Sequence, residues 1–367
     1  MTRQVENPFR NRAVVEELTS AIHDTANGLG DIAVMHVCGT HEHEIRRHAL
    51  RQLLPENVRL IAGPGCPVCI TPASVIATAI AIATIEDHPI VCTYGDMVRV
   101  PIEEGSLLDT RGKGADIRII YGIRDAVILA QDNPDHRVVF FSVGFETTAA
   151  PVAALLAAGI PDNLLIFSCH RYVPTAVRAL CMQDPTGVDG FLLPGHASVI
   201  TGTEPYRFLA RDFGRASAVA GFEPVDILLG MLSILRQKRN NAPTVANCYP
   251  RAVRDEGNRT AQDLLRRVFR IEDASWRGIG VLPETGFALA GDYRRLDAPE
   301  YYGIDEVSAR DIMPGCICHL VLMGRKSPAD CPLFGAACRP ENPQGPCMVS
   351  GEGTCRAHYL YPEVDDV

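Results

Sequence analysis

Four cysteines near the end of the sequence have a spacing that suits a metal centre. They follow the pattern C-x6-C-x8-C-x7-C, in a segment interrupted by prolines and glycines, at Cys331, Cys338, Cys347 and Cys355. Four thiolates in such a loop-rich segment favour a [4Fe–4S] cluster. Structural zinc usually uses a tighter C-x2-4-C pair, which this quartet lacks, so zinc is the second interpretation and disulfides are the third. Cys316 and Cys318 lie upstream and can replace one ligand.

Cys66 and Cys69 form a C-x-x-C pair directly after a run of apolar residues. Such a pair after a strand is typical of a redox dithiol or of half a metal site. The neighbouring Gly63 and Gly65 let the backbone approach another group closely. Because only two residues separate the thiols, a disulfide can form and break between them. We therefore predict a redox dithiol, with a metal half-site or two inert cysteines as the alternatives.

Cys38 and His41 belong to the segment Cys-Gly-Thr-His-Glu, which follows the first apolar run of the chain. Thr40 is suited to cap the helix expected to follow. Cys38 would then lie just ahead of a helix N-terminus, where the dipole and the free N–H groups favour the thiolate. A thiolate beside an imidazole suits a transition metal or a nucleophilic reaction. The alternative is a buried cysteine before a charged, solvated helix start.

Glu146 lies in the segment Gly-Phe-Glu-Thr-Thr, where a predicted strand gives way to a helix. Its carboxylate is a candidate for catalysis or for orienting a ligand. It is equally well explained as an acidic residue that stabilises a helix N-terminus. His170 and His196 also follow predicted strands. A lone histidine in that position is more often packed or hydrogen-bonded than catalytic.

The elements that must position these residues follow from the hydrophobic pattern. Short apolar, β-branched runs alternate with helical stretches between about residues 30 and 240. The runs predict strands at 32–37, 58–62, 90–93, 117–120, 138–143, 164–167, 191–193 and 216–220. The stretches between and after them predict helices at 42–54, 72–84, 123–130, 147–158, 175–182, 225–239 and 259–270.

Continuous apolar strands that alternate with helices favour parallel sheets covered on both faces. We predict an α/β protein with two doubly wound domains that face a cleft, plus a C-terminal cysteine-rich iron–sulfur domain. The expected ranges are 1–120 with Cys38 and the C-x-x-C pair, 121–240, and 241–367. Ligands bind outside the carboxyl ends of strands in such sheets, so we expect the candidate residues to converge there.

Composition and charge narrow the class of protein. The chain has 367 residues, of which 47% are hydrophobic and 22% charged, and its net charge is −9. This balance excludes a disordered or collagen-like chain and gives a nucleic-acid partner no support. The apolar stretches are short for a membrane span, which needs ~20 residues, so we expect a cytoplasmic protein without a membrane partner. Its 13 cysteines are then unsuited to a disulfide framework.

Several of these segments together resemble the HypD family of [NiFe]-hydrogenase maturation proteins. The resemblance rests on Cys38-Gly39-Thr40-His41-Glu42, on the Gly-Pro-Gly-Cys-Pro-Val-Cys segment that ends at Cys69, and on Gly144-Phe145-Glu146-Thr147-Thr148. It continues in Pro194-Gly195-His196 and in the tail from Cys331 to Cys355. The motifs occur in the family's order and span almost the whole chain.

The resemblance implies a scaffold on which the Fe(CN)2CO moiety of the hydrogenase is assembled. It implies a HypC-type small chaperone and a HypE-type cyanide donor as partners. Cys38 would hold the iron, together with a cysteine of the chaperone, while Cys66 and Cys69 would be a redox dithiol. His41 and Glu146 would support the iron or the transfer of its ligands. The four tail cysteines would bind a [4Fe–4S] cluster that lies close to the dithiol.

Two other functions remain compatible with the residues. One is a stand-alone iron–sulfur thiol-disulfide oxidoreductase that reduces a partner through Cys66 and Cys69. The other is a non-enzymatic interaction module stabilised by zinc. Turnover of a generic disulfide and the content of metal and sulfide distinguish these possibilities.

Overall fold

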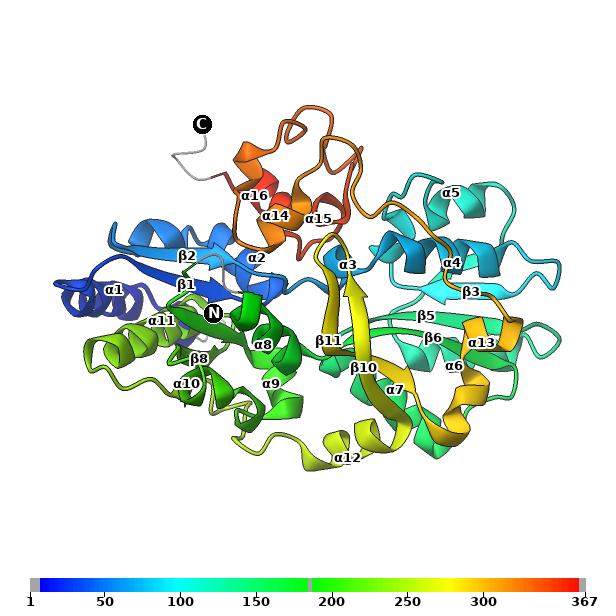
Figure 1. Ribbon diagram of the computed structural model, residues 1–367, viewed down its shortest axis with the longest axis horizontal. Helices are drawn as coiled ribbons and strands as arrows, with labels where there is room; N and C mark the ends of the chain where they lie inside the picture. The colour runs from blue at the N-terminus through cyan, green and yellow to red at the C-terminus, as the bar shows by residue number, and fades with distance from the viewer. Residues whose placement is uncertain (1–6, 184–186, 363–367) are drawn as a thin grey trace, which may run out of the picture.

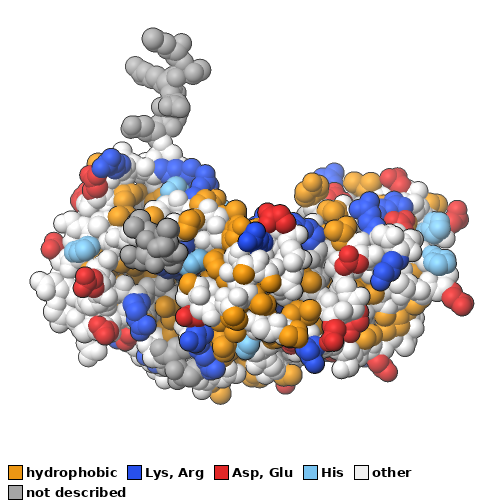
Figure 2. Space-filling view, turned by 90° about the horizontal axis from the view of Figure 1, so that it is seen from above, with side chains coloured by type: hydrophobic (Ala, Val, Ile, Leu, Met, Phe, Trp, Pro, Cys, Tyr) orange, Lys and Arg blue, Asp and Glu red, His pale blue; other side chains and the backbone are white. Residues whose placement is uncertain are grey.

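The computed structural model describes residues 7–183 and 187–362 and shows two α/β lobes with a cysteine-rich C-terminal segment packed against both. Each lobe contains one sheet with helices on both of its faces (Figure 1). The predicted fold class is therefore confirmed. In the space-filling view the outline of the molecule is hollowed between the two lobes, and acidic and basic side chains are interspersed on the face shown (Figure 2).

The first sheet has the order β2-β1-β7-β8-β9 and is parallel throughout. Its strands are β1 (Ile32–His36), β2 (Val58–Ala62), β7 (Gly190–Pro194), β8 (Ala216–Ala220) and β9 (Val245–Asn247). The three central strands are buried at every position, because helices cover both faces of the sheet. The helices of this lobe are α1 (Arg12–Ala26), α2 (Gly39–Arg47), α8 (Val173–Gln183), α9 (Gly195–Thr201), α10 (Phe208–Arg211) and α11 (Pro224–Arg239).

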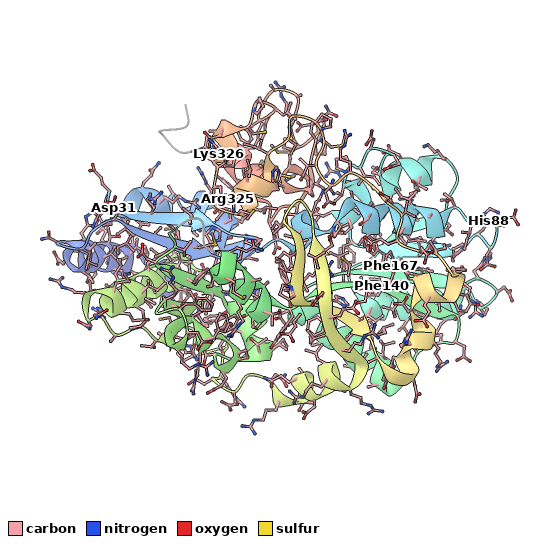
Figure 3. All side chains as sticks on the ribbon, in the orientation of Figure 1. Asp31, His88, Phe140, Phe167, Arg325 and Lys326 are labelled. Atoms are coloured by element: carbon pink, nitrogen blue, oxygen red, sulfur yellow. A yellow bond between two sulfur atoms is a disulfide. The ribbon has the colours of Figure 1, made fainter. Side chains whose placement is uncertain are left out.

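The second sheet has the order β10-β11-β6-β5-β3-β4. Its strands are β3 (Ile90–Thr93), β4 (Ile117–Ile119), β5 (Val138–Gly144), β6 (Leu164–Arg171), β10 (Phe269–Trp276) and β11 (Gly280–Leu289). Neighbouring side chains alternate between its faces, so Phe140 of β5 and Phe167 of β6 join different core clusters (Figure 3). The helices here are α3 (Pro67–Ile70), α4 (Ala73–Ala83), α5 (Leu107–Gly112), α6 (Ile123–Asp132), α7 (Glu146–Ala158), α12 (Arg259–Val268) and α13 (Ala298–Tyr302).

The strands are not distributed between the sheets as the ranges 1–120 and 121–240 would have them. β3 and β4 precede residue 121 but pair with β5 and β6 in the second sheet. β7 and β8 return to the first sheet, where β7 pairs with β1. The chain therefore crosses between the lobes after β2, after β6 and again after β9, and each lobe is built from two separate segments.

An antiparallel hairpin of β10 and β11 extends the second sheet beyond β6. Neither strand is predicted from the hydrophobic pattern. Only the first and last residues of β10 are fully buried, so the strand has neither an apolar run nor strict alternation. The hairpin tip reaches the short helices of the C-terminal segment (Figure 1). The predicted helix runs to residue 270, but α12 ends at Val268 and β10 begins at Phe269.

The C-terminal segment contains only short helices, α14 (Cys318–Leu322), α15 (Pro346–Val349) and α16 (Thr354–Leu360). Its buried side chains share one core cluster with α3, α4 and one face of the second sheet. The segment thus folds back over residues more than two hundred positions earlier, as the sequence analysis required. Within the two described ranges, no helix is both long and apolar enough to cross a membrane.

Candidate functional site

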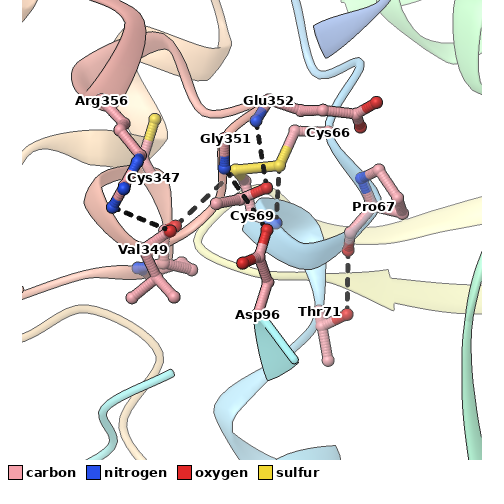
Figure 4. Close-up of a disulfide and its surroundings, with 12 residues drawn as sticks. Cys66, Pro67, Cys69, Thr71, Asp96, Cys347, Val349, Gly351, Glu352 and Arg356 are labelled. Atoms are coloured by element: carbon pink, nitrogen blue, oxygen red, sulfur yellow. Dashed lines mark hydrogen bonds between the residues drawn. A yellow bond between two sulfur atoms is a disulfide. The ribbon is translucent and has the colours of Figure 1, made fainter. Parts of the chain in front are cut away.

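Cys66 and Cys69 form a disulfide at the start of α3, directly beneath the C-terminal segment (Figure 4). Cys66 caps the helix, and Pro67 at the first helical position has no N–H that needs a partner. The Sγ atom of Cys69 lies 3.9 Å from the carbonyl oxygen of Pro346, the residue before Cys347. Both cysteines are at most 2% exposed. The pair is therefore close to the tail quartet and shielded from solvent.

Cys38 lies beside this disulfide because Gly65 packs against its backbone. The amide of Gly39 donates a hydrogen bond of 2.9 Å to the carbonyl of Gly65. A Cβ atom at Gly65 would overlap the backbone nitrogen and Cα of Cys38, so only glycine fits here. The close approach of these two loops, which follow the neighbouring strands β1 and β2, brings Cys38 next to Cys66.

Glu352 is a neighbour of Cys38 that the sequence analysis missed. It accepts a hydrogen bond of 2.8 Å from the Thr40 hydroxyl. A Cβ at Gly39 would lie 2.5 Å from the Cβ of Glu352, so this glycine lets the C-terminal loop approach the start of α2. Burial raises the pKa of Glu352, and the hydrogen bond from Thr40 acts against this rise. A lone acidic residue in a glycine-rich loop gives no sequence signal of this contact.

The surroundings of Cys38 favour the neutral thiol over the expected thiolate. Its pKa is raised to about 12 by burial and then by the nearby charge of Glu352. The backbone amides of His41 and Thr40 at the helix start act in the predicted direction and lower the pKa, but they are outweighed. Cys38 is thus a neutral thiol that must lose a proton when it binds a cation.

His41 is fully buried on α2, and its Nε2 atom lies 2.8 Å from the carbonyl oxygen of Gly221. Because a carbonyl only accepts, Nε2 carries the proton. Burial and the nearby His36 lower the pKa of His41 to about 3, which keeps the ring neutral. Its Nδ1 atom has no hydrogen-bond partner among the described residues. The ring packs against Phe222, which also stacks on His196 at 3.9 Å between centroids.

A buried ionic network fixes α2 below these residues. Glu42 contacts His36 at 2.7 Å and Arg51 at 2.6 Å. Burial acts to raise the pKa of Glu42, but the charge of Arg51 and the hydrogen bond from His36 lower it. Removing one member would leave an uncompensated buried charge, which costs about 3–5 kcal/mol in typical proteins. This network holds the helix that carries Cys38 and His41.

Glu146 lies at the start of α7, in a different environment from Cys38. One carboxylate oxygen accepts a hydrogen bond of 2.8 Å from the amide of Val173, and the other has no partner among the described residues. Burial raises the pKa of Glu146 to about 8. Burial, and then the charge of Glu146, raises the pKa of the Tyr172 and Tyr206 hydroxyls. The described contacts therefore connect Glu146 to tyrosines rather than to the cysteines.

His170 forms hydrogen bonds through both ring nitrogens, to Ser142 at 2.8 Å and to Ser168 at 3.0 Å. Burial lowers its pKa to about 3. It is a packed, hydrogen-bonded histidine, which agrees with the more common interpretation of a lone histidine at a strand end.

One cavity in the C-terminal segment is lined by six cysteines: Cys316, Cys318, Cys331, Cys338, Cys347 and Cys355. Backbone amides donate to two of the sulfurs, from Cys355 to Cys347 and from Gln344 to Cys338, each at 3.3 Å. Gly345 makes room for the first two thiols, since a Cβ there would lie 3.2 Å from the Cys316 sulfur. In the described part of the chain, no three His, Cys, Asp or Glu residues are placed to hold a single metal ion.

These sulfurs fit a thiolate-ligated cluster in the chemistry of the donor set. A soft, all-sulfur lining and amide donors to sulfur are features of iron–sulfur sites. The predicted quartet lines one cavity, and Cys316 and Cys318 join it.

Residues 13–362 match the HypD family, which is described as a hydrogenase formation family. The chain belongs to the HypD family. It is 44% identical to the hydrogenase maturation factor HypD of Escherichia coli, over 96% of each chain. It is 41% identical to HypD2 of Bradyrhizobium diazoefficiens, over 98% of this chain and 97% of that protein. It is 38% identical to HypD of Cupriavidus necator, over 98% of this chain and 97% of that protein.

In this HypD-family chain the C-terminal segment contacts each part of the site. Asp96, which follows β3, accepts a hydrogen bond of 3.3 Å from the amide of Gly351 (Figure 4). Arg99 donates to the carbonyl of Pro340 at 2.8 Å. The structure thus brings Cys38, the disulfide and the six-cysteine cavity together, and connects them to Asp96 and Glu352. Glu146 and His170 lie in environments of their own, whereas His196 shares the Phe222 ring with His41.

Proposed function

We propose that this protein acts in hydrogenase maturation as the iron–sulfur scaffold on which the Fe(CN)2CO moiety of a [NiFe]-hydrogenase is assembled. A HypC-type chaperone would share the iron, and a HypE-type protein would deliver cyanide. The observation that carries the proposal is the contact of Gly65, next to Cys66, with the backbone of Cys38. The Cys69 sulfur in turn lies 3.9 Å from the carbonyl oxygen of Pro346, which precedes the cavity residue Cys347. Membership of a hydrogenase formation family supports the same role.

Cys38 is the residue proposed to hold the iron, which is the cargo of the scaffold. Thiolates bind transition metals, so the neutral thiol must release its proton as iron arrives. Glu352 interacts electrostatically with Cys38, and burial raises its pKa, which makes its carboxylate a stronger base than an exposed one. His41 is kept neutral and its Nδ1 is unpartnered, so it can accept a hydrogen bond near the start of α2, although its pKa of about 3 makes it a poor base.

The four tail cysteines would hold a [4Fe–4S] cluster, which supplies electrons one at a time when bound. The Cys66–Cys69 pair exchanges two electrons between disulfide and dithiol. Because Cys69 contacts the residue before Cys347, electrons have a short path between the two centres. Glu146 keeps its proton up to a pH near 8 and would act as a hydrogen-bond donor in a region separate from the iron.

The decisive experiment replaces Cys38 with alanine and purifies the variant anaerobically with its small chaperone. We expect the infrared cyanide and CO bands to disappear while the cluster absorbance remains. Cys248→Ala is a matched control, because that thiol is half-buried next to α11 and follows β9, the edge strand three places from β1. Retention of the bands in Cys38→Ala would show that the iron is held elsewhere.

The alternative function is a stand-alone thiol-disulfide oxidoreductase, and the disulfide itself favours it. However, neither sulfur is accessible to a folded substrate, since both cysteines are at most 2% exposed. We expect no turnover of a generic disulfide without a partner protein. Catalytic reduction that is lost in Cys66→Ser would favour the oxidoreductase. One zinc per chain without acid-labile sulfide would instead favour the interaction module.

A further inference from the structure

Arg277 is a buried cation in the turn between β10 and β11. The tip of this hairpin lies between α3 and the C-terminal segment (Figure 1). The side chain of Arg277 is 1% exposed. Its amide donates to the carbonyl of Ile70, the last residue of α3, at 2.8 Å. The guanidinium donates to two more carbonyls, those of Asp311 at 2.6 Å and Pro101 at 3.1 Å. One backbone and two side-chain hydrogen bonds therefore fix the position of Arg277.

No carboxylate among the described residues forms an ion pair with this guanidinium. The nearest candidate, Asp311, uses its carboxylate oxygens to accept hydrogen bonds from the amides of Ala73 and Gly278. The Nη1 atom of Arg277 has no hydrogen-bond partner in the described structure. A buried charge without a counter-charge is strongly unfavourable, so the folded protein should supply one.

The anionic partners that the fold offers are the sulfurs of the cysteine cavity. Cys316 and Cys318, which act electrostatically on Arg277 together with Asp311, line the same cavity as the four proposed ligands. Gly278, the next residue of the hairpin tip, packs directly on α14, where a Cβ would lie 2.6 Å from the Cβ of His319. Trp276 belongs to the same core cluster as the disulfide and the cavity cysteines. The hairpin thus carries a positive charge to the boundary between the dithiol and the cavity.

We propose that Arg277 is the counter-charge of the cluster held in the cysteine cavity and raises its reduction potential, a proposal that rests on the cluster of the proposed function. A thiolate-ligated cluster is anionic and becomes more negative by one charge when it is reduced. A fixed cation nearby stabilises the reduced form more than the oxidised form. Net charge around an iron–sulfur cluster is one of the main determinants of its potential.

The test compares Arg277→Gln with Arg277→Lys in the full-length, cluster-loaded protein. Redox titration followed by electron paramagnetic resonance gives the midpoint potential of the cluster. We expect Arg277→Gln to lower the ratio of reduced to oxidised cluster at least tenfold at a fixed potential, about 59 mV for one electron. Arg277→Lys, which keeps the charge, should recover at least half of this shift. A cluster with an unchanged potential in Arg277→Gln would overturn the proposal.

A second measurement separates a charge effect from damage to the hairpin. Arg171→Gln is the matched control, since Arg171 is also buried and donates to the carbonyl of Ser275 in the same hairpin. We expect loading with iron and sulfide to raise Tm less in Arg277→Met than in the wild type and Arg171→Gln. An equal rise of Tm in all three proteins would overturn the proposal. The proposal would also be overturned, in favour of a structural role, if Arg277→Gln and Arg277→Lys both failed to bind iron and sulfide while Arg171→Gln bound them. Absence of iron and sulfide from the wild type would overturn the proposed cluster itself, and the inference with it.

Discussion

At the scale of single residues, the chemistry of Cys38 depends on which neighbours determine its protonation. The helix start was expected to favour the thiolate, and the backbone amides of α2 do act in that direction. Burial and the carboxylate of Glu352 raise the pKa of Cys38 by more than these amides lower it, because a buried thiolate loses its hydration and faces a negative charge. A helix N-terminus alone therefore does not make a cysteine reactive when the site is closed.

The first prediction concerns Glu352→Gln, which removes that negative charge and keeps the hydrogen bond from Thr40 possible. We expect the pKa of Cys38, now about 12, to fall, so that alkylation of the Cys38 thiol begins at a lower pH. Rates of iodoacetamide labelling, measured for the Cys38 peptide by mass spectrometry across pH 7 to pH 11, give the shift. Glu16→Gln on the exposed face of α1 is the control. An identical pH profile in Glu352→Gln and wild type would contradict the assigned role.

The second prediction concerns Gly65, whose missing side chain allows Cys38 and Cys66 to approach. In Gly65→Ala the new methyl group must push the Cys38 backbone away. We expect a loss of about 1–3 kcal/mol in the free energy of unfolding, as for other overpacked sites, and loss of iron bound with the chaperone. Gly112→Ala on α5 is the control, because no atom lies within 4 Å of its added Cβ. Iron binding at wild-type levels in Gly65→Ala would rule out the need for this close contact.

At the scale of elements, the sequence predicted those strands that are apolar throughout. The bounds of β2, β3 and β8 agree with the prediction, because each is a short β-branched or alanine-rich run closed by a turn. β6 extends four residues past the predicted end, through polar residues that pair with β5 and β11. The β10–β11 hairpin was missed, since its exposed, charged positions hide the strand period.

The third prediction concerns α7, whose first residue is the buried Glu146. Its pKa is raised to about 8 by burial, against about 4.3 in an unfolded chain. Between these values the folded state binds one proton more than the unfolded state. The contribution of Glu146 to the free energy of unfolding is therefore greatest below the unfolded pKa. It falls as pH rises, by at most about 1.4 kcal/mol per pH unit. Glu146→Gln, which cannot ionise, should lack this decline.

Urea denaturation of both proteins at pH 5, 6, 7 and 8 measures this difference. The stability of Glu146→Gln relative to the wild type should increase steadily over this range. Glu17→Gln on α1 serves as an exposed control and should follow the wild type. A constant difference between Glu146→Gln and the wild type would mean that Glu146 does not titrate between pH 5 and pH 8.

At the scale of the whole molecule, residues from distant segments form one site, and this is what one sequence predicts least well. The cysteines were identified from residue type and spacing alone. Their neighbours Glu352 and Arg277 were not, because a single acidic or basic residue has no pattern. The division of strands between the lobes could not be predicted either, since apolar runs do not specify strand order. What the resemblance added was the expectation that these cysteines act together.

The last prediction concerns the C-terminal segment, whose helices α14, α15 and α16 have five, four and seven residues. Isolated helices this short are not stable, so the segment depends on tertiary packing and on the proposed cluster. Removing the metal with a chelator and a mild oxidant should increase amide hydrogen exchange in residues 314–360. The increase should extend to α3, which contacts the segment through Cys69 and Pro346.

The strands β1, β7 and β8 provide the internal reference for this experiment. They belong to a sheet whose core is built by other helices, so their exchange should change little on metal removal. Equal protection of residues 314–360 with and without metal would contradict a structural role for the cluster. A uniform loss of protection over both lobes would instead indicate global unfolding, in which case the segment would not be a separately stabilised unit.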